Sequence, residues 1–191
     1  TSVLQPAEIS RVAGDGLARV TRVNDGFLKS IRLGRVERFR ATSRDGTPVD
    51  GFLTLPPGQA PGQPLPSILR IHGGPASQYS TGFELDWQML AAHGYAVIAA
   101  NPRGSTGYGT AFGNAIDQAY PSVDYDDLMA GVDTVIGRGY VDTKQLYVAG
   151  CSGGGVLSSW IIGHTTRFAG AAVRCPVTNW LSMAGQTDIP L

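Results

Sequence analysis

The feature that most constrains the fold of this chain is the alternation of short apolar runs with helical patterns after its first third. The apolar runs are hydrophobic at consecutive positions, which is typical of strands covered on both faces of a sheet. Strands are expected at 67–72, 95–100, 146–149 and 170–174, and helices at 83–93, 125–138 and 155–164. In the first of these helices Leu85, Met89 and Leu90 are expected to share one face. The alternation predicts an α/β fold, with a mostly parallel sheet and helices on both faces.

The first part of the chain follows a different pattern. Two alternating runs, 36–42 and 49–55, are joined by a segment that contains Asp45-Gly46, which predicts a hairpin. This N-terminal hairpin is expected to form an antiparallel edge of the sheet. Residues 1–35 are polar without a sustained period, so they are interpreted as a linker or the tail of an upstream domain. The domain that follows is expected to occupy residues 36–191.

Charge and composition argue against several classes of function. The 15 basic and 15 acidic residues are spread along the chain, which argues against a surface for nucleic acid. No apolar run reaches the roughly 18 residues that a membrane span needs. Residues 1–10 lack the pattern of a signal peptide. No metal or organic cofactor is implied by any motif.

Two cysteines, Cys151 and Cys175, are present. Neither lies in a CxxC or Cys/His cluster, and one pair in a chain of this length is no disulfide framework. Both are therefore interpreted as small buried apolar residues. Unpaired cysteines fit the cytoplasm, and a periplasmic location stays open.

The run Gly150-Cys151-Ser152-Gly153-Gly154 matches the pattern G-x-S-x-G. In a chain with 26 glycines the pattern alone says little, but here an apolar strand precedes it and a helix follows it. Such a turn holds a serine hydroxyl at the carboxyl end of a sheet, beside the free N–H groups of a helix N-terminus. Ser152 is therefore the candidate nucleophile. The alternative is a dinucleotide-binding turn, but no G-x-G-x-x-G with a later acidic residue occurs early in the chain.

A second glycine-rich loop, His72-Gly73-Gly74-Pro75, follows an earlier apolar strand. Hydrolases with a G-x-S-x-G turn complete an oxyanion hole with a backbone N–H from a loop of this kind. One N–H from this loop and one from Gly153 would stabilise a tetrahedral intermediate. His72 is expected to shape the loop, because this fold supplies its catalytic histidine after the nucleophile.

Four ordered segments resemble the prolyl oligopeptidase family of serine peptidases, in its acylaminoacyl-peptidase branch. They are ILRIHGGPASQ at 68–78, NPRGSTGYG at 101–109, VAGCSGGG at 148–155 and PVTNWLSMAGQTDIP at 176–190. Segment 25–58 also resembles the approach to that family's hydrolase domain from its β-propeller. The resemblance implies an α/β-hydrolase fold with Ser152 as nucleophile. It also implies that the N–H groups of Gly74 and Gly153 form the oxyanion hole.

The chain departs from the family on both sides of the nucleophile. Family members often carry an aromatic residue directly after it, whereas this chain has Gly153. An N–H donor is kept there, but a ring that could line the first subsite is lost. Cys151, before the serine, is less usual in the family. Arg103 of the segment 101–109 is interpreted as part of a loop that shapes the site without taking part in chemistry.

The triad Asp and His are not found in this chain. In this fold the order is Ser, then Asp or Glu, then His, but only Asp188 and His164 follow Ser152, in the wrong order. His164 lies far along the helix that begins at the nucleophile and is interpreted as solvent-facing. The chain is therefore expected to be a fragment of the catalytic domain, incomplete at its C-terminus and inactive alone. Completion by a second chain and a non-catalytic remnant are the alternatives.

The sequence thus predicts a serine hydrolase that cleaves acyl-peptide or oligopeptide bonds through an acyl-enzyme on Ser152. The resemblance implies short peptide substrates. It also implies that the partners are a propeller and a C-terminal catalytic segment of the same enzyme. From charge and hydropathy, neither nucleic acid nor a membrane is expected as a partner. An esterase or amidase for small acyl substrates would use the same machinery. A non-catalytic binding domain with a hydrolase fold is the third hypothesis.

Overall fold

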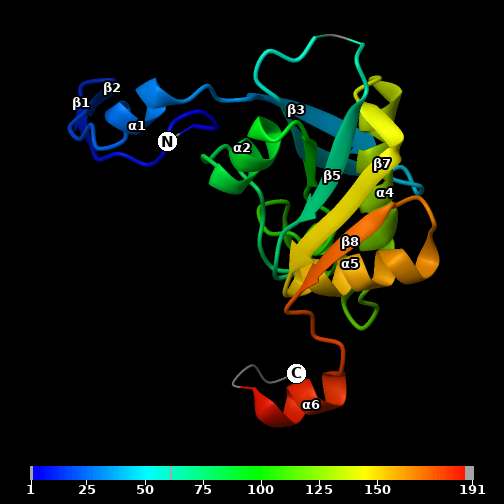
Figure 1. Ribbon diagram of the computed structural model, residues 1–191. Coiled ribbons are helices and arrows are strands. Elements are labelled where there is room, and N and C mark those ends of the chain that lie inside the picture. The colour runs from blue at the N-terminus through cyan, green and yellow to red at the C-terminus, as the bar shows by residue number, and fades with distance from the viewer. Residues whose placement is uncertain (1, 61, 188–191) are drawn as a thin grey trace.

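The computed structural model describes residues 2–60 and 62–187, so Asp188 lies outside the described residues. Its main body is built on a six-stranded sheet with the strand order β3-β4-β6-β5-β7-β8 (Figure 1). The strands are β3 (Arg35–Thr42), β4 (Pro48–Leu55), β5 (Leu65–Ile71), β6 (Ala96–Ala100), β7 (Val141–Cys151) and β8 (Gly170–Arg174).

The pairing of the strands confirms the predicted mixed sheet. β4 runs antiparallel to β3 and to β6, whereas β5 pairs in parallel with β6 and β7, and β7 with β8. The N-terminal hairpin β3–β4 therefore forms an antiparallel edge on a parallel sheet, as predicted. Because parallel strands end on the same side, the residues after β5, β7 and β8 meet at one edge of the sheet.

Helices cover both faces of this sheet, which confirms the predicted layers. α4 (Val123–Gly137) and α5 (Gly153–His164) pack on one face, and α2 (Leu85–Ala92) packs on the other (Figure 1). The run of β6 is apolar throughout because its side chains are buried on both faces of the sheet. Its Ile98 belongs to the core beneath α4 and α5, while the neighbouring Val97 belongs to the core beneath α2.

The face that α2 buries differs from the expected one. Leu85 and Met89 are 49% and 55% exposed, whereas Trp87 and Ala91 lie in the core. The segment has apolar residues on every side, so its pattern does not define a single stripe. The bulk of the Trp87 indole decides the orientation, and its ring packs against Phe52 with the centroids 5.6 Å apart.

Residues ahead of the main sheet form a small unit of their own. β1 (Ser10–Ala13) and β2 (Gly16–Arg19) pair as a separate antiparallel hairpin, followed by α1 (Asp25–Ser30). Figure 1 shows this unit standing away from the main body. The two strands and the helix were not expected from the sequence, and the interpretation of residues 1–35 as a linker stays a prediction.

Shorter helical elements lie between β6 and α4 and after β8. α3 (Thr110–Gly113) and the 3-10 helix η1 (Asn114–Ile116) lie in the connection between β6 and α4, and α6 (Trp180–Gln186) follows β8. Figure 1 shows α6 below the main body. Among the described residues, none of the helices combines the length and apolar character that a membrane crossing requires.

The orientation of α2 can be tested by truncating one side chain on each of its faces in the full-length protein. We expect Trp87→Ala to destabilise the protein by about 3–5 kcal/mol, because a buried indole is lost and a cavity remains. Leu85→Ala should change stability by less than about 0.5 kcal/mol, since this side chain is half exposed. Urea unfolding followed by circular dichroism measures both, and equal losses would contradict the observed orientation.

Candidate active site

Ser152 occupies the turn between β7 and α5 in a backbone conformation that side chains seldom adopt. β7 ends at Cys151 and α5 begins at Gly153, so one residue makes the whole reversal. The dihedral angles of Ser152 are φ 58° and ψ −122°. A strained serine at a strand-to-helix turn is the geometry expected of a nucleophile elbow.

The flanking glycines are required by contacts between backbones. A side chain at Gly150 would collide with the backbone of Gly154. A Cβ at Gly154 would meet the carbonyl oxygen of His72 at 2.8 Å and approach that of Ile71 more closely still. The elbow is thus packed against the end of β5, where Ile71 is in register with Gly150.

The predicted oxyanion residues are brought together by this packing. A Cβ at Gly153 would lie 3.1 Å from the nitrogen of Gly74 and 2.5 Å from its oxygen. Gly153 is the first residue of α5, so its N–H has no acceptor within the helix. Gly74 has φ +118°, a conformation that favours glycine. The backbones of two residues far apart in the sequence therefore converge beside Ser152.

His72 holds the loop that carries Gly74. Its Nδ1 lies 2.7 Å from the carbonyl oxygen of Gly73, and its Nε2 lies 3.0 Å from the hydroxyl of Ser105. Burial lowers the pKa of His72, which favours the neutral ring. In the neutral tautomer that satisfies Gly73, Nδ1–H donates to the carbonyl, and Nε2 faces the Ser105 hydroxyl, whose single proton is shared between this nitrogen and the carbonyl oxygen of Pro102 at 2.6 Å. The ring thus shapes the loop, in keeping with its predicted role.

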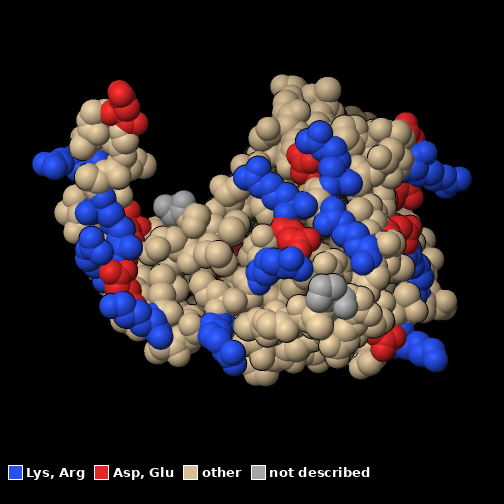
Figure 2. Space-filling model, turned by 90° about the horizontal axis from the view of Figure 1, so that it is seen from above, with Lys and Arg blue, Asp and Glu red and all other residues tan. Residues whose placement is uncertain are grey.

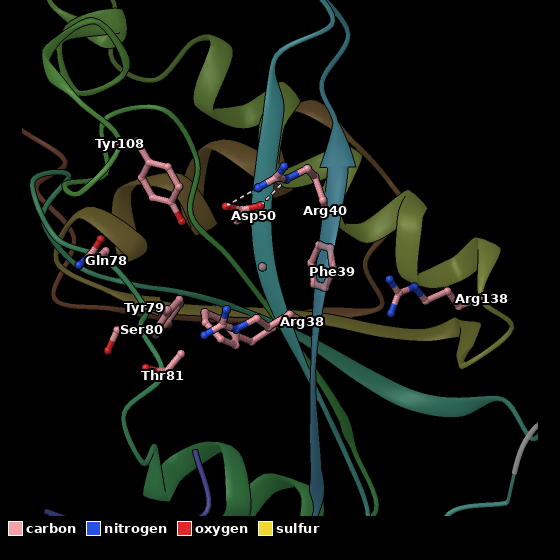
Figure 3. Close-up of a pocket in the computed structure, with 12 residues that line it drawn as sticks. Arg38, Phe39, Arg40, Asp50, Gln78, Tyr79, Ser80, Thr81, Tyr108 and Arg138 are labelled. Carbon is pink, nitrogen blue, oxygen red and sulfur yellow. Dashed lines mark hydrogen bonds and ion pairs between the residues drawn. The ribbon is translucent and has the colours of Figure 1, made fainter. Parts of the chain in front are cut away.

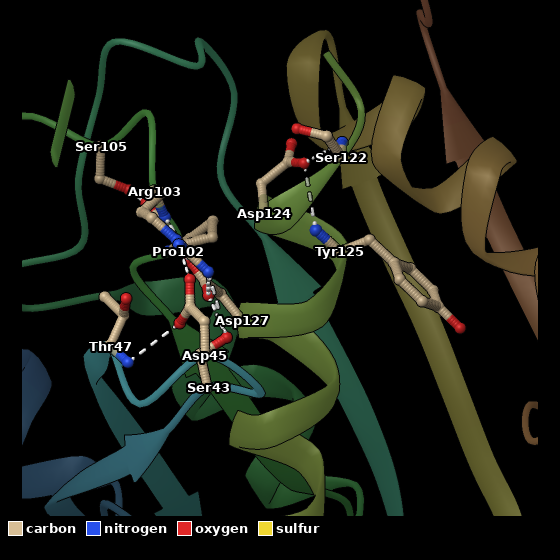
Figure 4. A network of polar contacts seen from close by, with 10 residues as sticks. All are labelled: Ser43, Asp45, Thr47, Pro102, Arg103, Ser105, Ser122, Asp124, Tyr125 and Asp127. Atoms are coloured by element: carbon tan, nitrogen blue, oxygen red, sulfur yellow. Dashed lines mark hydrogen bonds and ion pairs between the residues drawn. The ribbon is translucent and has the colours of Figure 1, made fainter. Parts of the chain in front are cut away.

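Arg103 anchors the neighbouring loop through a buried ion pair (Figure 4). Its Nε and Nη2 donate to the carboxylate of Asp127 at 2.9 and 2.7 Å, and its backbone N–H donates to the same group at 2.8 Å. Asp45 and Ser43 in the β3–β4 turn complete the arrangement. The hydrogen bonds that the guanidinium donates to Asp127 raise the pKa of Arg103 above its usual value. The described partners of this guanidinium, Asp127, Asp45 and Ser43, tie the loop to α4 and to the β3–β4 turn, which agrees with the predicted shaping role.

The interpretation of the two cysteines as separate buried residues is wrong. Cys151 and Cys175 form a disulfide with their Cα atoms 5.4 Å apart. Cys151 pairs with Arg174 across β7 and β8, so Cys175 follows directly beside it. The bond links the nucleophile turn to the exit of β8. Disulfides persist in oxidising compartments, so the cysteines no longer favour the cytoplasm.

His164 does not reach Ser152, and Asp188 lies outside the described residues. His164 is exposed in the last turn of α5, where its ring stacks on Trp160 with the centroids 3.7 Å apart. The 12 residues of this helix span about 18 Å. Across residues 2–60 and 62–187, no three His, Cys, Asp or Glu side chains are grouped so as to hold a metal ion.

Two hollows are lined in part by the chain around and after the oxyanion loop, one by residues 78–81 and the other by residues 75–76. The larger, of about 620 Å³, lies over β3 and β4 and is lined by Arg38, Arg40 and Tyr108 among others (Figure 3). In it Arg40 Nε donates to Asp50 at 2.7 Å. Figure 2 shows basic and acidic side chains interspersed over the face it views. Ser152 is in the lining of neither hollow.

The smaller hollow, of about 470 Å³, adjoins the oxyanion loop itself. Its walls include Pro75 of that loop and the next residue, Ala76, with Tyr120 and Trp180 on the other sides. The sequence interpretation did not single out Tyr120, which lies in a loop without a motif. Its place beside the hollow and the nucleophile turn is set by the fold and not by a sequence pattern.

The comparisons with known proteins agree with this geometry. Residues 81–191, more than half of the chain, match the model of the prolyl oligopeptidase family. The chain therefore belongs to the prolyl oligopeptidase family of peptidases, and its fold is that of an α/β hydrolase.

Individual relatives define the branch to which the chain is similar. It is 39% identical to an uncharacterized peptidase, YuxL, of Bacillus subtilis over 97% of this chain and 28% of that protein. Acylamino-acid-releasing enzyme 1 of Oryza sativa is 36% identical over 65% of this chain and 16% of its own. The structure of Pyrococcus horikoshii acylaminoacyl peptidase matches with a TM-score of 0.90 and 25% identity, over 98% of this chain and 30% of that one. The chain thus spans less than a third of the length of these relatives.

The neutral state of His72 predicts a pH dependence of stability. Because the folded state lowers the pKa of this ring, the unfolded chain binds its proton more readily. The contribution is present above the unfolded pKa of about 6.5 and is lost as the pH falls through the lower folded value. In the full-length protein we expect the melting temperature to fall between about pH 7.5 and pH 5. The fall should be smaller in His72→Gln. His93→Gln, at an exposed position, is the control and should behave as wild type.

The disulfide predicts the outcome of thiol mapping. In full-length protein purified without reductant, alkylation in denaturant should leave Cys151 and Cys175 unmodified. Their peptides should be recovered by mass spectrometry as one cross-linked species, which reduction separates into two alkylatable peptides. Complete alkylation of both cysteines before reduction would contradict the bond.

Proposed function

We propose that this chain forms the nucleophile-bearing part of a serine peptidase that resembles acylaminoacyl peptidases. The observation that carries the proposal is the convergence of Ser152, Gly153 and Gly74 in a chain of this family. A serine in a strained turn, beside two backbone N–H groups, suits an acyl-transfer reaction. It does not require a metal or an organic cofactor for that chemistry.

The reaction would proceed through an acyl-enzyme. The Oγ of Ser152 attacks the carbonyl carbon of the scissile bond, and the negative charge on the carbonyl oxygen is stabilised by the N–H groups of Gly74 and Gly153. The proton of Ser152 passes to a histidine base and then to the leaving amine as the C–N bond breaks. Water hydrolyses the ester by the same route in reverse.

We assign the base and its orienting carboxylate to the remainder of the whole protein. The chain covers 28% of its Bacillus subtilis relative, so most of such an enzyme lies outside it. The His164 position argues against a role as base, because the helix carries this ring away from the turn. The remainder of the enzyme, including a propeller domain and the C-terminal catalytic segment, is proposed as the structural partner.

Short peptides, including N-acylated ones, are the proposed substrates. The support comes from the names of the relatives, which release acylated amino acids or are called acylaminoacyl peptidases. An esterase or amidase would use the same turn and the same N–H donors. Turnover of short-chain esters without any cleavage of acyl-peptide anilides would therefore contradict the peptidase proposal.

The nucleophile can be tested in the full-length protein with one serine changed at a time. Ser152→Ala should lower kcat/KM for an acyl-peptide anilide by about 10⁴-fold or more, because the attacking atom is lost. It should also abolish labelling by a fluorophosphonate probe. Ser159→Ala is the matched control, since this hydroxyl lies on α5 and donates to the carbonyl of Gly155 at 3.0 Å. Labelling that survives in Ser152→Ala would overturn the assignment.

A further inference from the structure

Tyr120 reaches the nucleophile turn from the loop that precedes α4. Its hydroxyl donates to the carbonyl oxygen of Gly153 at 2.9 Å. Burial raises the pKa of this phenol above its usual value, so it stays a protonated donor. The hydrogen bond fixes the first peptide group of α5, which adjoins the N–H proposed to bind the oxyanion.

The ring of Tyr120 also forms a wall of the smaller hollow beside the oxyanion loop. Trp180 from α6 stands across from it, with the ring centroids 6.3 Å apart and the planes at 74°. Pro75 and Ile116 supply further apolar surface. A Cβ at Gly104 would lie 3.1 Å from Pro75 Cβ and 2.5 Å from Ile116 Cδ1, so these walls are closely packed.

The chemistry of this hollow favours a large apolar side chain. Its volume of about 470 Å³ lies within the range of ligand pockets, which is about 300–1,000 Å³. Aromatic rings and a proline form the walls, while Asn114, Asp117 and Gln118 supply the polar part of the lining. Aromatic side chains pack favourably against such rings in edge-to-face geometry.

A side chain at position 153 could not form part of the wall beside the nucleophile. A side chain there would collide with the backbone of Gly74, as the 2.5 Å approach to its oxygen shows. The space next to the serine is therefore occupied by backbone, and the aromatic surface comes from Tyr120 instead. This residue belongs to a different segment from the nucleophile motif.

We propose that Tyr120 is a positioning and specificity-determining residue of the peptidase. Its ring lines a subsite for an aromatic or large aliphatic side chain next to the scissile bond, and its hydroxyl holds the peptide group beside the Gly153 donor. The inference rests on the proposed peptidase function. The side chain belongs either to the residue that is acylated onto the serine or to the residue that leaves.

Kinetics of the full-length enzyme test both roles with two series of substrates. One series varies the acyl-side residue among Ala, Leu and Phe before an anilide, and the other varies the leaving-side residue in an acylated dipeptide amide. Tyr120→Ala should lower the Phe-to-Ala ratio of kcat/KM by about tenfold or more in one series, because a ring contact is lost. The series that responds identifies the side of the bond.

A second variant isolates the hydroxyl. Tyr120→Phe should keep the Phe-to-Ala ratio and lower kcat about two- to tenfold for all substrates alike, which is the effect of one lost hydrogen bond. Tyr120→Trp restores a large ring and should restore part of the preference. Tyr95→Ala, at the residue just before β6 and away from the turn, should leave the Phe-to-Ala ratio of both series unchanged.

The outcomes separate this inference from the proposed function. If the wild-type enzyme cleaves the substrates but Tyr120→Ala keeps both ratios, the subsite is overturned while the peptidase stands. A Tyr120→Phe variant with wild-type kcat overturns the positioning role alone. If wild-type enzyme cleaves neither series and does not react with a fluorophosphonate, the peptidase proposal fails and the subsite with it. Thermal melting of each variant identifies any loss caused by unfolding.

Discussion

The parallel pairing of β5 with β7 is the interaction on which the site depends. It sets Ile71 beside Gly150, so the two chain reversals that follow these strands occur at the same edge of the sheet. The reversals then pack backbone against backbone, which only glycine permits at this distance. A register shift of one residue would turn every side chain of β7 to the opposite face. The core beneath α4 and α5 therefore fixes the position of Ser152.

The buried ion pair between Arg103 and Asp127 stabilises the loop that contacts the oxyanion loop. Asp127 is fully buried and Arg103 nearly so, and removing both charges from water carries a penalty of several kcal/mol per ion. The penalty is offset because each carboxylate oxygen accepts from the guanidinium, and one also accepts from the backbone N–H of Arg103. The same loop carries Ser105, which contacts His72. The pair thus links α4 to the oxyanion loop through contacts that a neutral substitute would not reproduce.

The sequence predicted those elements whose patterns are set by local physics. The apolar run of β6 is buried on both faces, and β8 has the predicted bounds. The turn at Ser152 was recognisable because its glycines are required by backbone contacts. The apolar periodicity did not predict which face of α2 is buried, because apolar residues surround this helix. Its orientation is set by the packing of Trp87. The hairpin β1–β2 was missed because its strands are short and largely exposed.

Contacts between distant segments were beyond what spacing could predict. The disulfide follows from the adjacency of β7 and β8, because strand pairing sets Cys175 beside Cys151. The position of Tyr120 follows from the path of the loop before α4, which carries no periodic pattern.

Gly153 is significant both as a departure in the sequence motif and as a contact between distant segments of the fold. In sequence it marks the loss of a ring next to the nucleophile. In the fold it permits the backbone of Gly74 to approach to a distance that a side chain would prevent. A side chain at position 153 is therefore incompatible with the close approach of the Gly74 backbone in this chain. An aromatic wall beside the nucleophile would then come from another segment, as we propose for Tyr120, whose hydroxyl donates to the carbonyl oxygen of Gly153.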